Sequence, residues 1–244
     1  MIVYQYFIMT EHNVGILLQG IVYDCTKKII DEYEQNFPDA HILLSTWNTE
    51  NTKDICCDVI KLEPPNDPSH INHQILGVRE GLKKINSEII MKCRTDQFIH
   101  NKNIFNIFKN GCSKNKIMIQ NFGTFSNVEY WASDFCQIGY RETLLEFWNS
   151  IPYFDGNWDK NRRATTTWEN SSNPITEIFL TGNYIIKGKK DLRPWDEIIG
   201  EYYYVKDYTR DWQIEWERLT QAWYNWYHKR FFDLFYKKCC AVEK

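Results

Sequence analysis

Three charged residues on alternate positions, Lys92, Arg94 and Asp96, follow a short apolar run at residues 89–91. The run is too short for a helix and follows a polar boundary, so it predicts a buried strand. The period of two predicts that the three charges project to one side of the strand end. Ligands of open α/β sheets bind at the carboxyl ends of the strands.

A carboxylate flanked by two cations at such a strand end suits a pyrophosphate group, with or without a metal ion. The acid would hold the ion, and the cations would hold phosphate oxygens. The alternative is a solvated strand end with a surface ion pair.

Polar residues also stand at the ends of other expected strands and at the start of one expected helix: Gln19-Gly20, Ser45-Thr46-Trp47, Asn72 and Gln74. At Gly20 a backbone without a side chain can approach a ligand closely. Asn72 and Gln74 fall in the first turn of their helix, so they could cap it as easily as bind a ligand.

Several familiar motifs are missing from the sequence. No Gly-x-Gly-x-x-Gly follows the first strand, and the spacing of Gly182 and Gly188 before Lys189 does not match a phosphate-binding loop. There is no Gly-x-Ser-x-Gly and no His-Glu-x-x-His. His70 and His73 have no obvious metal-binding partner in the sequence, so they are expected to be helix-entry residues.

Composition narrows the class of protein. The chain has 244 residues and a formal charge of −3, so no overall basic field favours nucleic acid as a partner. None of the eight cysteines forms a Cys-x-x-Cys pair, which favours free thiols in a reducing compartment. The sequence shows neither a convincing signal peptide nor a transmembrane run. A soluble cytoplasmic protein is therefore expected.

In the first hundred residues, expected strands and helices alternate in the order that is typical of a parallel sheet. The apolar run at 15–21 predicts a central strand. Apolar positions at 71, 75, 78, 82 and 85 predict the clearest helix. The expected order is strand 15–21, helix 24–37, strands 41–45 and 57–61, helix 70–85 and strand 88–96.

The second half is less regular. Strands are expected at 116–120, 135–140 and 201–206, and helices at 141–148 and 175–186. The polar stretch 157–173 is expected to be a lid or a disordered segment. One long helix is predicted over 209–238, with an aromatic stripe that includes Trp212, Trp216 and Trp223. The stripe could pack on the sheet domain, form a homodimer or rest at a membrane interface.

Four motifs in this order resemble the WavE lipopolysaccharide-synthesis family. They are Leu18-Gln19-Gly20, Leu44-Ser45-Thr46-Trp47, the helix segment Asn72-His73-Gln74-Ile75-Leu76-Gly77-Val78-Arg79-Glu80-Gly81-Leu82, and Lys92-Cys93-Arg94-Thr95-Asp96. Two later segments are also similar, namely Ser133-Asp134 before Gly139 and Pro174-Ile175-Thr176-Glu177. The resemblance is good over residues 15–100, patchy to about 187 and absent from the terminal segment.

The resemblance implies an A-type glycosyltransferase (GT-A) fold and a nucleotide-sugar donor. In such enzymes an Asp-x-Asp motif at a strand end holds a divalent cation against the donor diphosphate. Here Arg94 stands in place of the first acid, and only Asp96 remains. Mn²⁺ or Mg²⁺ on Asp96 is the favoured expectation, and direct neutralisation of the diphosphate by Arg94 is the alternative.

The resemblance also offers two acids for catalysis. An inverting transfer needs a base to deprotonate the acceptor hydroxyl, and Asp134 or Glu177 would supply it. For Glu177 the alternative is an acid that stabilises a helix N-terminus. Donor contacts are expected from Gln19, Gly20, Thr46, Asn72, Gln74, Lys92, Arg94 and Asp96, with the nucleoside near Gln19 and Thr46. Trp47 is expected to be a core aromatic.

The sequence thus predicts an α/β protein with a GT-A-like, mostly parallel sheet flanked by helices. Residues 1–207 would form the glycosyltransferase domain, with a nucleotide-binding half (1–100) and an acceptor half (101–207). Residues 208–244 would form a helical tail packed on it. The expected activity is transfer of a sugar to a hydroxyl of a glycan or lipid-linked glycan, at the inner face of a membrane if the tail touches one. The alternatives are nucleotidyl transfer to a sugar phosphate and a non-catalytic glycan- or membrane-binding module.

Overall fold

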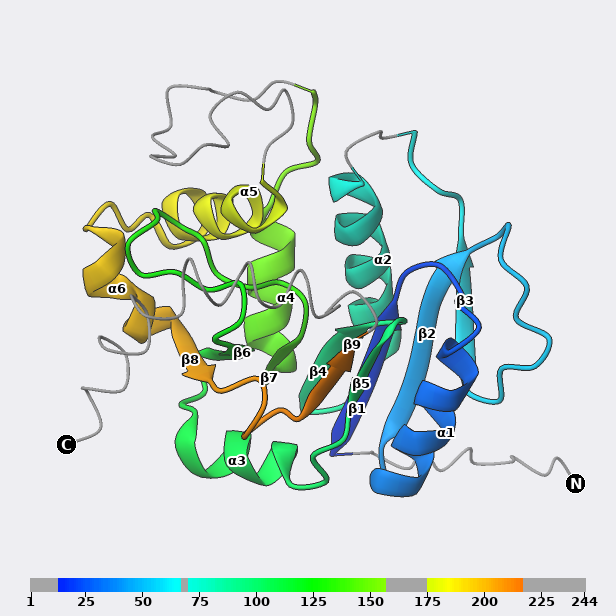
Figure 1. Cartoon of the computed structure of the whole chain (residues 1–244). Coiled ribbons are helices and arrows are strands. Elements are labelled where there is room, and N and C mark those ends of the chain that lie inside the picture. The colour runs from blue at the N-terminus through cyan, green and yellow to red at the C-terminus, as the bar shows by residue number, and fades with distance from the viewer. Residues whose placement is uncertain (1–12, 67–69, 157–174, 217–244) are drawn as a thin grey trace, which may run out of the picture.

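The computed structural model describes residues 13–66, 70–156 and 175–216, and shows a sheet with helices on both faces (Figure 1). Its strands are β1 Val14–Gln19, β2 His41–Trp47, β3 Asp58–Leu62, β4 Ile89–Arg94, β5 Gln97–Ile99, β6 Ile117–Gln120, β7 Gln137–Tyr140, β8 Tyr203–Lys206 and β9 Ile214–Trp216. Its α-helices are α1 Thr26–Asn36, α2 Ile71–Lys84, α3 Ile104–Gly111, α4 Arg141–Ser150, α5 Thr176–Asn183 and α6 Trp195–Tyr202. A π-helical turn, Tyr184–Lys189, continues α5.

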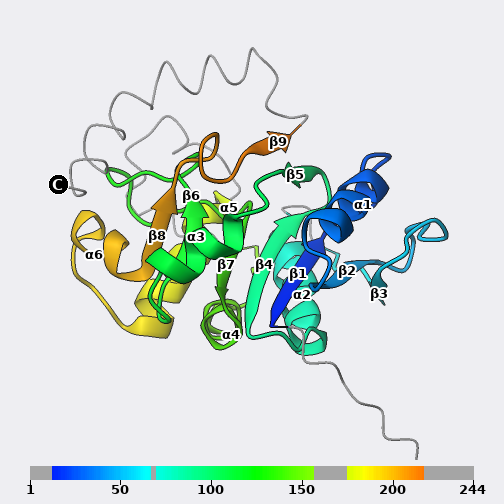
Figure 2. The same ribbon diagram turned by 90° about the horizontal axis from the view of Figure 1, so that it is seen from below.

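Seven strands form the main sheet in the order β3-β2-β1-β4-β7-β6-β8. The pairs β1–β2, β1–β4, β2–β3 and β6–β8 are parallel, whereas β7 runs antiparallel to both of its neighbours. Strands β5 and β9 form a separate antiparallel pair outside the main sheet (Figure 2). This arrangement confirms the predicted fold class, a mostly parallel sheet flanked by helices.

Each face of the sheet has its own hydrophobic core. Leu17, Leu43 and Ile90 lie on one face with buried residues of α2, α4, α5 and α6. Ile16, Leu18 and neighbouring strand residues lie on the other face with α1 and α3. Successive side chains of a strand point to opposite faces, so a strand covered on both faces is apolar throughout. This is why β1 reads as an unbroken apolar run.

Helix α2 packs closely on β1 because it carries glycine at two positions that face the strand. A Cβ atom on Gly81 would lie 2.4 Å from Leu17 Cδ1, and one on Gly77 would lie 2.7 Å from Gln19 Cγ. The Ser45 hydroxyl also donates to the Gly77 carbonyl at 2.7 Å. These contacts fix the first turns of α2 beside the carboxyl ends of β1 and β2.

The predicted elements of the first half are confirmed, with boundaries that differ by a few residues. In the second half the strands at 116–120 and 135–140 and the helix at 141–148 are confirmed as β6, β7 and α4. Helix 175–186 corresponds to α5 and the π-helical turn, and strand 201–206 corresponds to β8. Helices α3 and α6 and strands β5 and β9 were not predicted.

The predicted terminal helix is wrong at its start. Residues 209–213 form turns, and Ile214–Trp216 form β9 instead of a helix. Trp212 is fully buried against the α1 and α3 face. The rest of that prediction, with its homodimer and membrane contacts, lies outside the described residues, as does the whole of the polar stretch 157–173.

The two predicted halves of residues 1–207 share one sheet, because β4 of the first half pairs with β7 of the second. Within the described parts of the chain, no helix is both long enough and apolar enough to cross a bilayer.

His100 links β9 to helix α1. Its Nδ1 lies 2.6 Å from Glu32 Oε1, and its Nε2 lies 3.1 Å from Glu215 Oε2. Burial opposes protonation of His100, but the hydrogen bonds and charges of the two glutamates raise its pKa above the ordinary value of 6.5. The two glutamates therefore favour the charged form of the imidazole, which links the β5–β9 pair to α1.

We expect His100→Gln to destabilise the protein most at low pH. A group with a raised folded-state pKa contributes its full stability below its unfolded pKa, and that contribution is lost as pH rises through the folded value. The difference in melting temperature between wild type and His100→Gln should therefore be largest below pH 6.5 and shrink at alkaline pH. An equal difference at every pH would contradict the charged link.

Candidate active site

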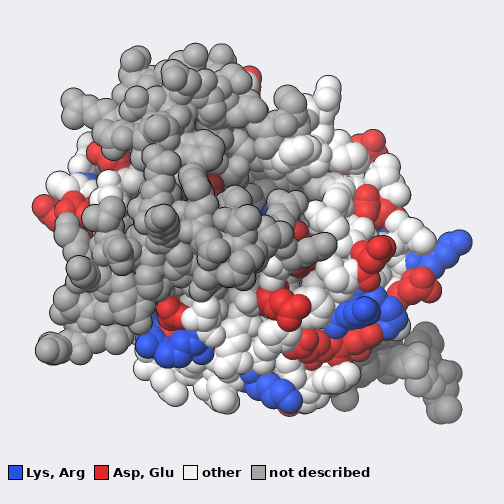
Figure 3. Space-filling view, viewed as in Figure 1, with Lys and Arg blue, Asp and Glu red and all other residues white. Residues whose placement is uncertain are grey.

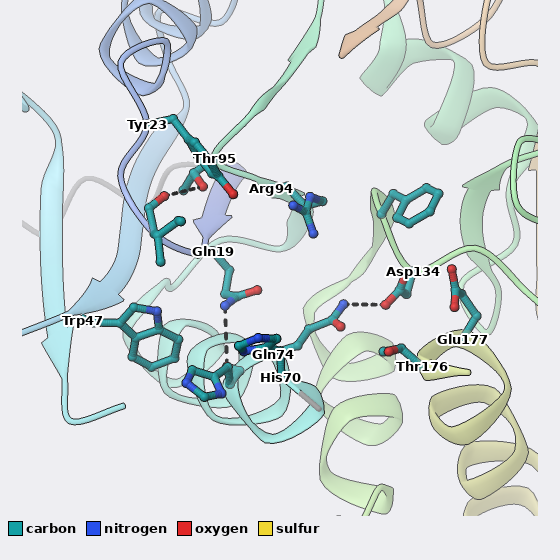
Figure 4. Close-up of a pocket in the computed structure, with 14 residues that line it drawn as sticks. Gln19, Tyr23, Trp47, His70, Gln74, Arg94, Thr95, Asp134, Thr176 and Glu177 are labelled. Carbon is teal, nitrogen blue, oxygen red and sulfur yellow. Dashed lines mark hydrogen bonds between the residues drawn. The ribbon is translucent and has the colours of Figure 1, made fainter. Parts of the chain in front are cut away.

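A cavity of about 390 Å³ opens at the carboxyl ends of β1 and β4. One side is formed by the loops after these strands, with Gln19, Tyr23 and Thr95, and the other by Asp134 and Glu177 (Figure 4). Arg94 points into the space between the two sides. The cavity thus brings one cation and two acids to the edge of the sheet where ligands of α/β proteins bind.

The strand register explains why these residues meet. Gln19 of β1 lies opposite Ser45 of β2 and Arg94 of β4, so three strand ends reach the same edge. Strand β7 is antiparallel to β4, and Gln137 lies opposite Lys92. The segment that precedes β7 therefore lies at the carboxyl end of β4, which brings Asp134 next to Arg94.

Arg94 is held from behind by Asp96 and Trp216. Its Nε and Nη2 donate to the two Asp96 carboxylate oxygens at 2.8 and 3.0 Å. The Trp216 indole donates to Asp96 Oδ2 at 3.1 Å, and the guanidinium lies 5.4 Å from the centre of the Trp216 ring. Burial disfavours the charge of Arg94, but the hydrogen bonds and charge of Asp96 raise its pKa above the ordinary value. Arg94 therefore stays a fixed cation.

Asp134 is positioned by two groups. The Gln74 amide donates to Asp134 Oδ2 at 2.7 Å, as the dashed line in Figure 4 shows. The Lys92 ammonium donates to the Asp134 backbone carbonyl at 2.5 Å and lies 5.4 Å from the centre of the Trp148 ring. Lys92 is fully buried, and burial lowers its pKa despite the nearby charge of Asp134. Lys92 thus holds the backbone of Asp134 in place and does not line the cavity.

Glu177 lies in the first turn of α5 and faces the same cavity. Burial, and then the negative charge of Asp134, raise the pKa of the Glu177 carboxyl to about 8. At neutral pH the Glu177 carboxyl is therefore mostly protonated and donates a hydrogen bond, whereas an ionised acid would only accept. A carboxyl group with a raised pKa beside a second carboxyl group is typical of an acid/base site.

We expect Glu177→Gln to stabilise the protein at alkaline pH. Between pH 4.5 and about 8 the unfolded chain loses the Glu177 proton and the folded protein keeps it, so wild-type stability falls as pH rises across this window. The uncharged glutamine removes that loss, by on the order of 2 kcal/mol at pH 8 once solvent around the partly exposed side chain is allowed for.

Thermal unfolding of wild type and Glu177→Gln at pH 5, 6.5 and 8 measures this gain. The advantage of the variant should grow with each step. Equal stabilities at all three pH values would contradict the raised pKa of Glu177.

Hydrogen bonds join the loops after β1 and β4. Thr95 Oγ1 donates to the Ile21 carbonyl at 2.6 Å, and Thr26 Oγ1 donates to the Thr95 carbonyl at 2.9 Å. Gly20 has a φ of 142°, a backbone conformation that favours glycine, and a Cβ there would lie 2.9 Å from Thr95 Oγ1. Close packing of these loops gives the cavity a fixed floor.

Several predicted donor contacts line the cavity and others do not. Gln19, Gly20, Gln74 and Arg94 line it, together with Asp134 and Glu177. Thr46 is fully buried and does not line it. Lys92 and Asp96 lie behind the lining residues that they support.

Asn72 is engaged away from the cavity. Its Nδ2 donates to the Phe154 carbonyl, and the Phe154 N–H donates to Asn72 Oδ1. These contacts anchor the segment after α4 to the start of α2.

The structure adds lining residues that the sequence did not reveal as such. Trp47, expected as a core aromatic, lies at the cavity edge with 4 % of its surface exposed, and its ring centre is 5.1 Å from that of His73. The His70 and His73 rings meet edge to face, with centres 5.2 Å apart, and line the cavity too. Ile21, Tyr23, Thr95, Phe135 and Thr176 complete this group. The position of His70 and His73 at the start of an expected helix was the one signal for them in the sequence.

The described residues do not fit a metal ion on Asp96. Both carboxylate oxygens are engaged by Arg94 and one also by Trp216, and the side chain is only 7 % exposed. Elsewhere in residues 13–66, 70–156 and 175–216, no group of three His, Cys, Asp or Glu side chains could hold a metal. Mn²⁺ or Mg²⁺ on Asp96 stays a prediction that this geometry does not favour.

Over the described part of the face shown in Figure 3, acidic and basic side chains are mixed. In the cavity, by contrast, the ionisable side chains of Arg94, Asp134 and Glu177 lie close together.

The chain belongs to the WavE lipopolysaccharide synthesis family, whose model matches residues 18–208. This match confirms the resemblance drawn from the four motifs and extends it across the second half of the sheet. No curated protein sequence matches the chain.

Solved structures that are similar to this chain include a glycosyltransferase, a cytidylyltransferase and a bifunctional enzyme, all at low identity. A glycosyltransferase involved in the glycosylation of the major capsid of PBCV-1 has 12% identity and a TM-score of 0.43, over 80% of this chain and 82% of that chain. A cytidylyltransferase from Leptospira borgpetersenii serovar Hardjo-bovis has 14% identity and a TM-score of 0.44, over 82% and 78%. The bifunctional IspDF from Campylobacter jejuni has 13% identity and a TM-score of 0.40, over 60% of this chain and 45% of that chain.

Proposed function

We propose that the protein is a glycosyltransferase that moves a sugar from a nucleoside-diphosphate sugar to a hydroxyl of a glycan acceptor. The observation that carries the proposal is the convergence of Arg94, Asp134 and Glu177 on one cavity at the carboxyl edge of the sheet. Membership of a lipopolysaccharide synthesis family supports a glycan as the acceptor.

The donor nucleoside would lie on the side of Gln19 and Tyr23, where aromatic rings and amide groups offer stacking and hydrogen bonds. The diphosphate would then reach Arg94, whose planar guanidinium pairs well with phosphate oxygens. The sugar would extend toward the two acids.

The reaction would break the bond between the anomeric carbon and the oxygen of the β-phosphate. The acceptor oxygen would form the new bond to that carbon, and the bonding electrons would leave with the nucleoside diphosphate. Asp134 would take the proton of the acceptor hydroxyl, and Arg94 would offset the charge that develops on the leaving phosphate. Glu177, protonated at neutral pH, would donate a hydrogen bond to a sugar or phosphate oxygen.

Nucleotidyl transfer to a sugar phosphate is the second candidate. That reaction brings a nucleoside triphosphate and a sugar phosphate together, which places many negative charges in one site. Of the described residues that line the cavity, Arg94 is the one lysine or arginine, and two acids face it. The loop after β1, Gly20 to Asp24, carries no basic residue. One cation and an available base suit a diphosphate donor and a neutral hydroxyl acceptor better.

A thermal-shift panel tests the proposal. UDP, GDP, CMP and dTDP sugars would be added to wild type and to Gln19→Ala, which alters the nucleoside side of the cavity. Ligand at a hundred times its dissociation constant adds about 2.7 kcal/mol of stability. We expect one nucleotide class to raise the melting temperature of wild type and to raise that of Gln19→Ala less. No shift from any donor would favour a non-catalytic glycan- or membrane-binding module.

A further inference from the structure

We propose that this protein binds its donor diphosphate without a metal ion, through Arg94, and that Asp96 is the positioning residue of that arginine. The inference rests on the proposed function and names how the site recognises phosphate. It rests on the hydrogen bonds that Asp96 already accepts, on the edge of Arg94 that faces the cavity, and on the residues that pack against the pair.

Asp96 already has cationic and neutral donors on its carboxylate. Two N–H groups of Arg94 form a bidentate pair with it, and the Trp216 indole adds a third hydrogen bond. A metal ion bound to Asp96 would have to displace these donors from a carboxylate that is 93% hidden, since only 7 % of its side chain is exposed. Breaking a buried pair leaves a buried charge without compensation, which is strongly unfavourable.

Arg94 presents its other donors to the cavity. Its side chain is 29% exposed, it lines the cavity, and Asp96 does not. The bonds to Asp96 use Nε and Nη2, so Nη1 is left without a partner among the described residues. A guanidinium with one edge fixed by a carboxylate and the other open is prepared to bind an anion, because little side-chain entropy remains to be lost.

The residues behind Arg94 keep it in this orientation. The guanidinium stacks on the Trp216 ring, and that ring packs on Phe135 with ring centres 5.0 Å apart. Trp216 belongs to β9, which pairs with β5 directly after Asp96. The β5–β9 pair therefore supports the arginine and its carboxylate partner through Trp216.

The cavity offers one other place for a cation, between Asp134 and Glu177. Two carboxyl groups with substrate phosphates can hold Mg²⁺. Gln74 occupies Asp134 Oδ2, and Glu177 keeps its proton at neutral pH, so this pair is a poor ligand set as it stands. A metal ion between these two acids is therefore treated as a separate outcome of the experiment.

Calorimetric titration of UDP and of GDP tests the proposal, in excess EDTA and in excess MnCl₂. The proteins are wild type, Arg94→Lys, Arg94→Gln, Asp96→Asn and Asp134→Asn, with Arg210→Gln as a matched control at an exposed ion pair. We expect at least one nucleoside diphosphate to bind wild type equally well in EDTA and MnCl₂. Arg94→Gln should weaken that binding more than tenfold, Arg94→Lys by less, and Asp96→Asn by a few-fold as Arg94 loses its fixed orientation.

Asp96→Asn keeps the shape of the side chain and one of its two acceptor oxygens, so part of the contact with Arg94 and Trp216 remains while the carboxylate charge that a metal ion would need is lost. Binding that requires Mn²⁺ and is lost in Asp96→Asn would overturn the proposal in favour of a metal on Asp96. Binding that requires Mn²⁺ and is lost in Asp134→Asn would overturn it in favour of a metal between the acids. If neither UDP nor GDP binds in either condition, dTDP and CMP are titrated in the same way, and failure of all four would contradict the donor site itself, and so the proposed function as well.

Discussion

Asp134→Asn is expected to lower kcat for sugar transfer by a factor of about 10² to 10⁴, the usual contribution of a general base. Asparagine keeps the shape of the side chain, and the Gln74 amide can still donate to its oxygen, but the side chain no longer accepts the proton of the acceptor hydroxyl. Donor affinity should change little, because Arg94 and not Asp134 would hold the diphosphate. The measurement is kcat and KM for release of nucleoside diphosphate.

Glu177→Gln is the matched control for this prediction. The pKa of Glu177, raised to about 8, leaves a protonated carboxyl at neutral pH, and glutamine replaces it with an uncharged donor of similar shape. We expect Glu177→Gln to retain activity within about tenfold of wild type at pH 7. A larger loss in Glu177→Gln than in Asp134→Asn would identify Glu177 as the base instead.

Lys92→Met is expected to fold stably but to lower kcat by about tenfold or more, because a small misplacement of a reacting group is costly. Methionine fills most of the volume of the buried lysine and removes an ammonium whose pKa burial has lowered. A lowered lysine pKa means that the folded protein disfavours the charged form, so removal of the amine should help stability more at pH 7 than at pH 10. The Asp134 carbonyl, however, loses its donor.

Lys92→Ala separates packing from positioning. It should lower the free energy of unfolding by about 2–4 kcal/mol relative to Lys92→Met, because it leaves a cavity beside Trp148. Both variants should lose activity alike, since both lack the hydrogen bond to Asp134. Full activity in Lys92→Met would contradict a positioning role for the lysine. The measurements are urea unfolding and kcat on the same preparations.

The sequence carried enough information to predict the sheet of the first half and the edge where its polar residues meet. Apolar runs and helical patterns identified β1 to β4, α1 and α2. Because strands and helices alternate, the strands are expected to be parallel, which places Gln19 and Arg94 at the same edge of the sheet. The same pattern could not show which of the charges reach solvent. Lys92 shares a face with Arg94, but α4 covers it with Trp148, and that packing is visible only in three dimensions.

Other predicted roles depended on geometry that no local pattern contains. Asn72 and Gln74 are two positions apart on a helix, so they face different directions, and only Gln74 reaches the cavity. Asp96 follows the end of β4, where the chain no longer alternates, and it turns to meet Trp216 more than a hundred residues away in the sequence. The aromatic spacing around Trp212 and Trp216 predicted a helix, but tertiary packing instead gives a turn and the strand that pairs with β5.

Mass spectrometry of the leaving group is the most direct way to distinguish sugar transfer from nucleotidyl transfer. Wild type would be incubated with the nucleoside-diphosphate sugar that binds, with and without a lipopolysaccharide preparation as acceptor, and in parallel with the matching nucleoside triphosphate and sugar phosphate. A glycosyltransferase releases the nucleoside diphosphate in the first reaction, faster with acceptor, and Asp134→Asn should abolish that release. Pyrophosphate release in the second reaction, with no turnover in the first, would contradict sugar transfer as the activity and make the protein a nucleotidyltransferase.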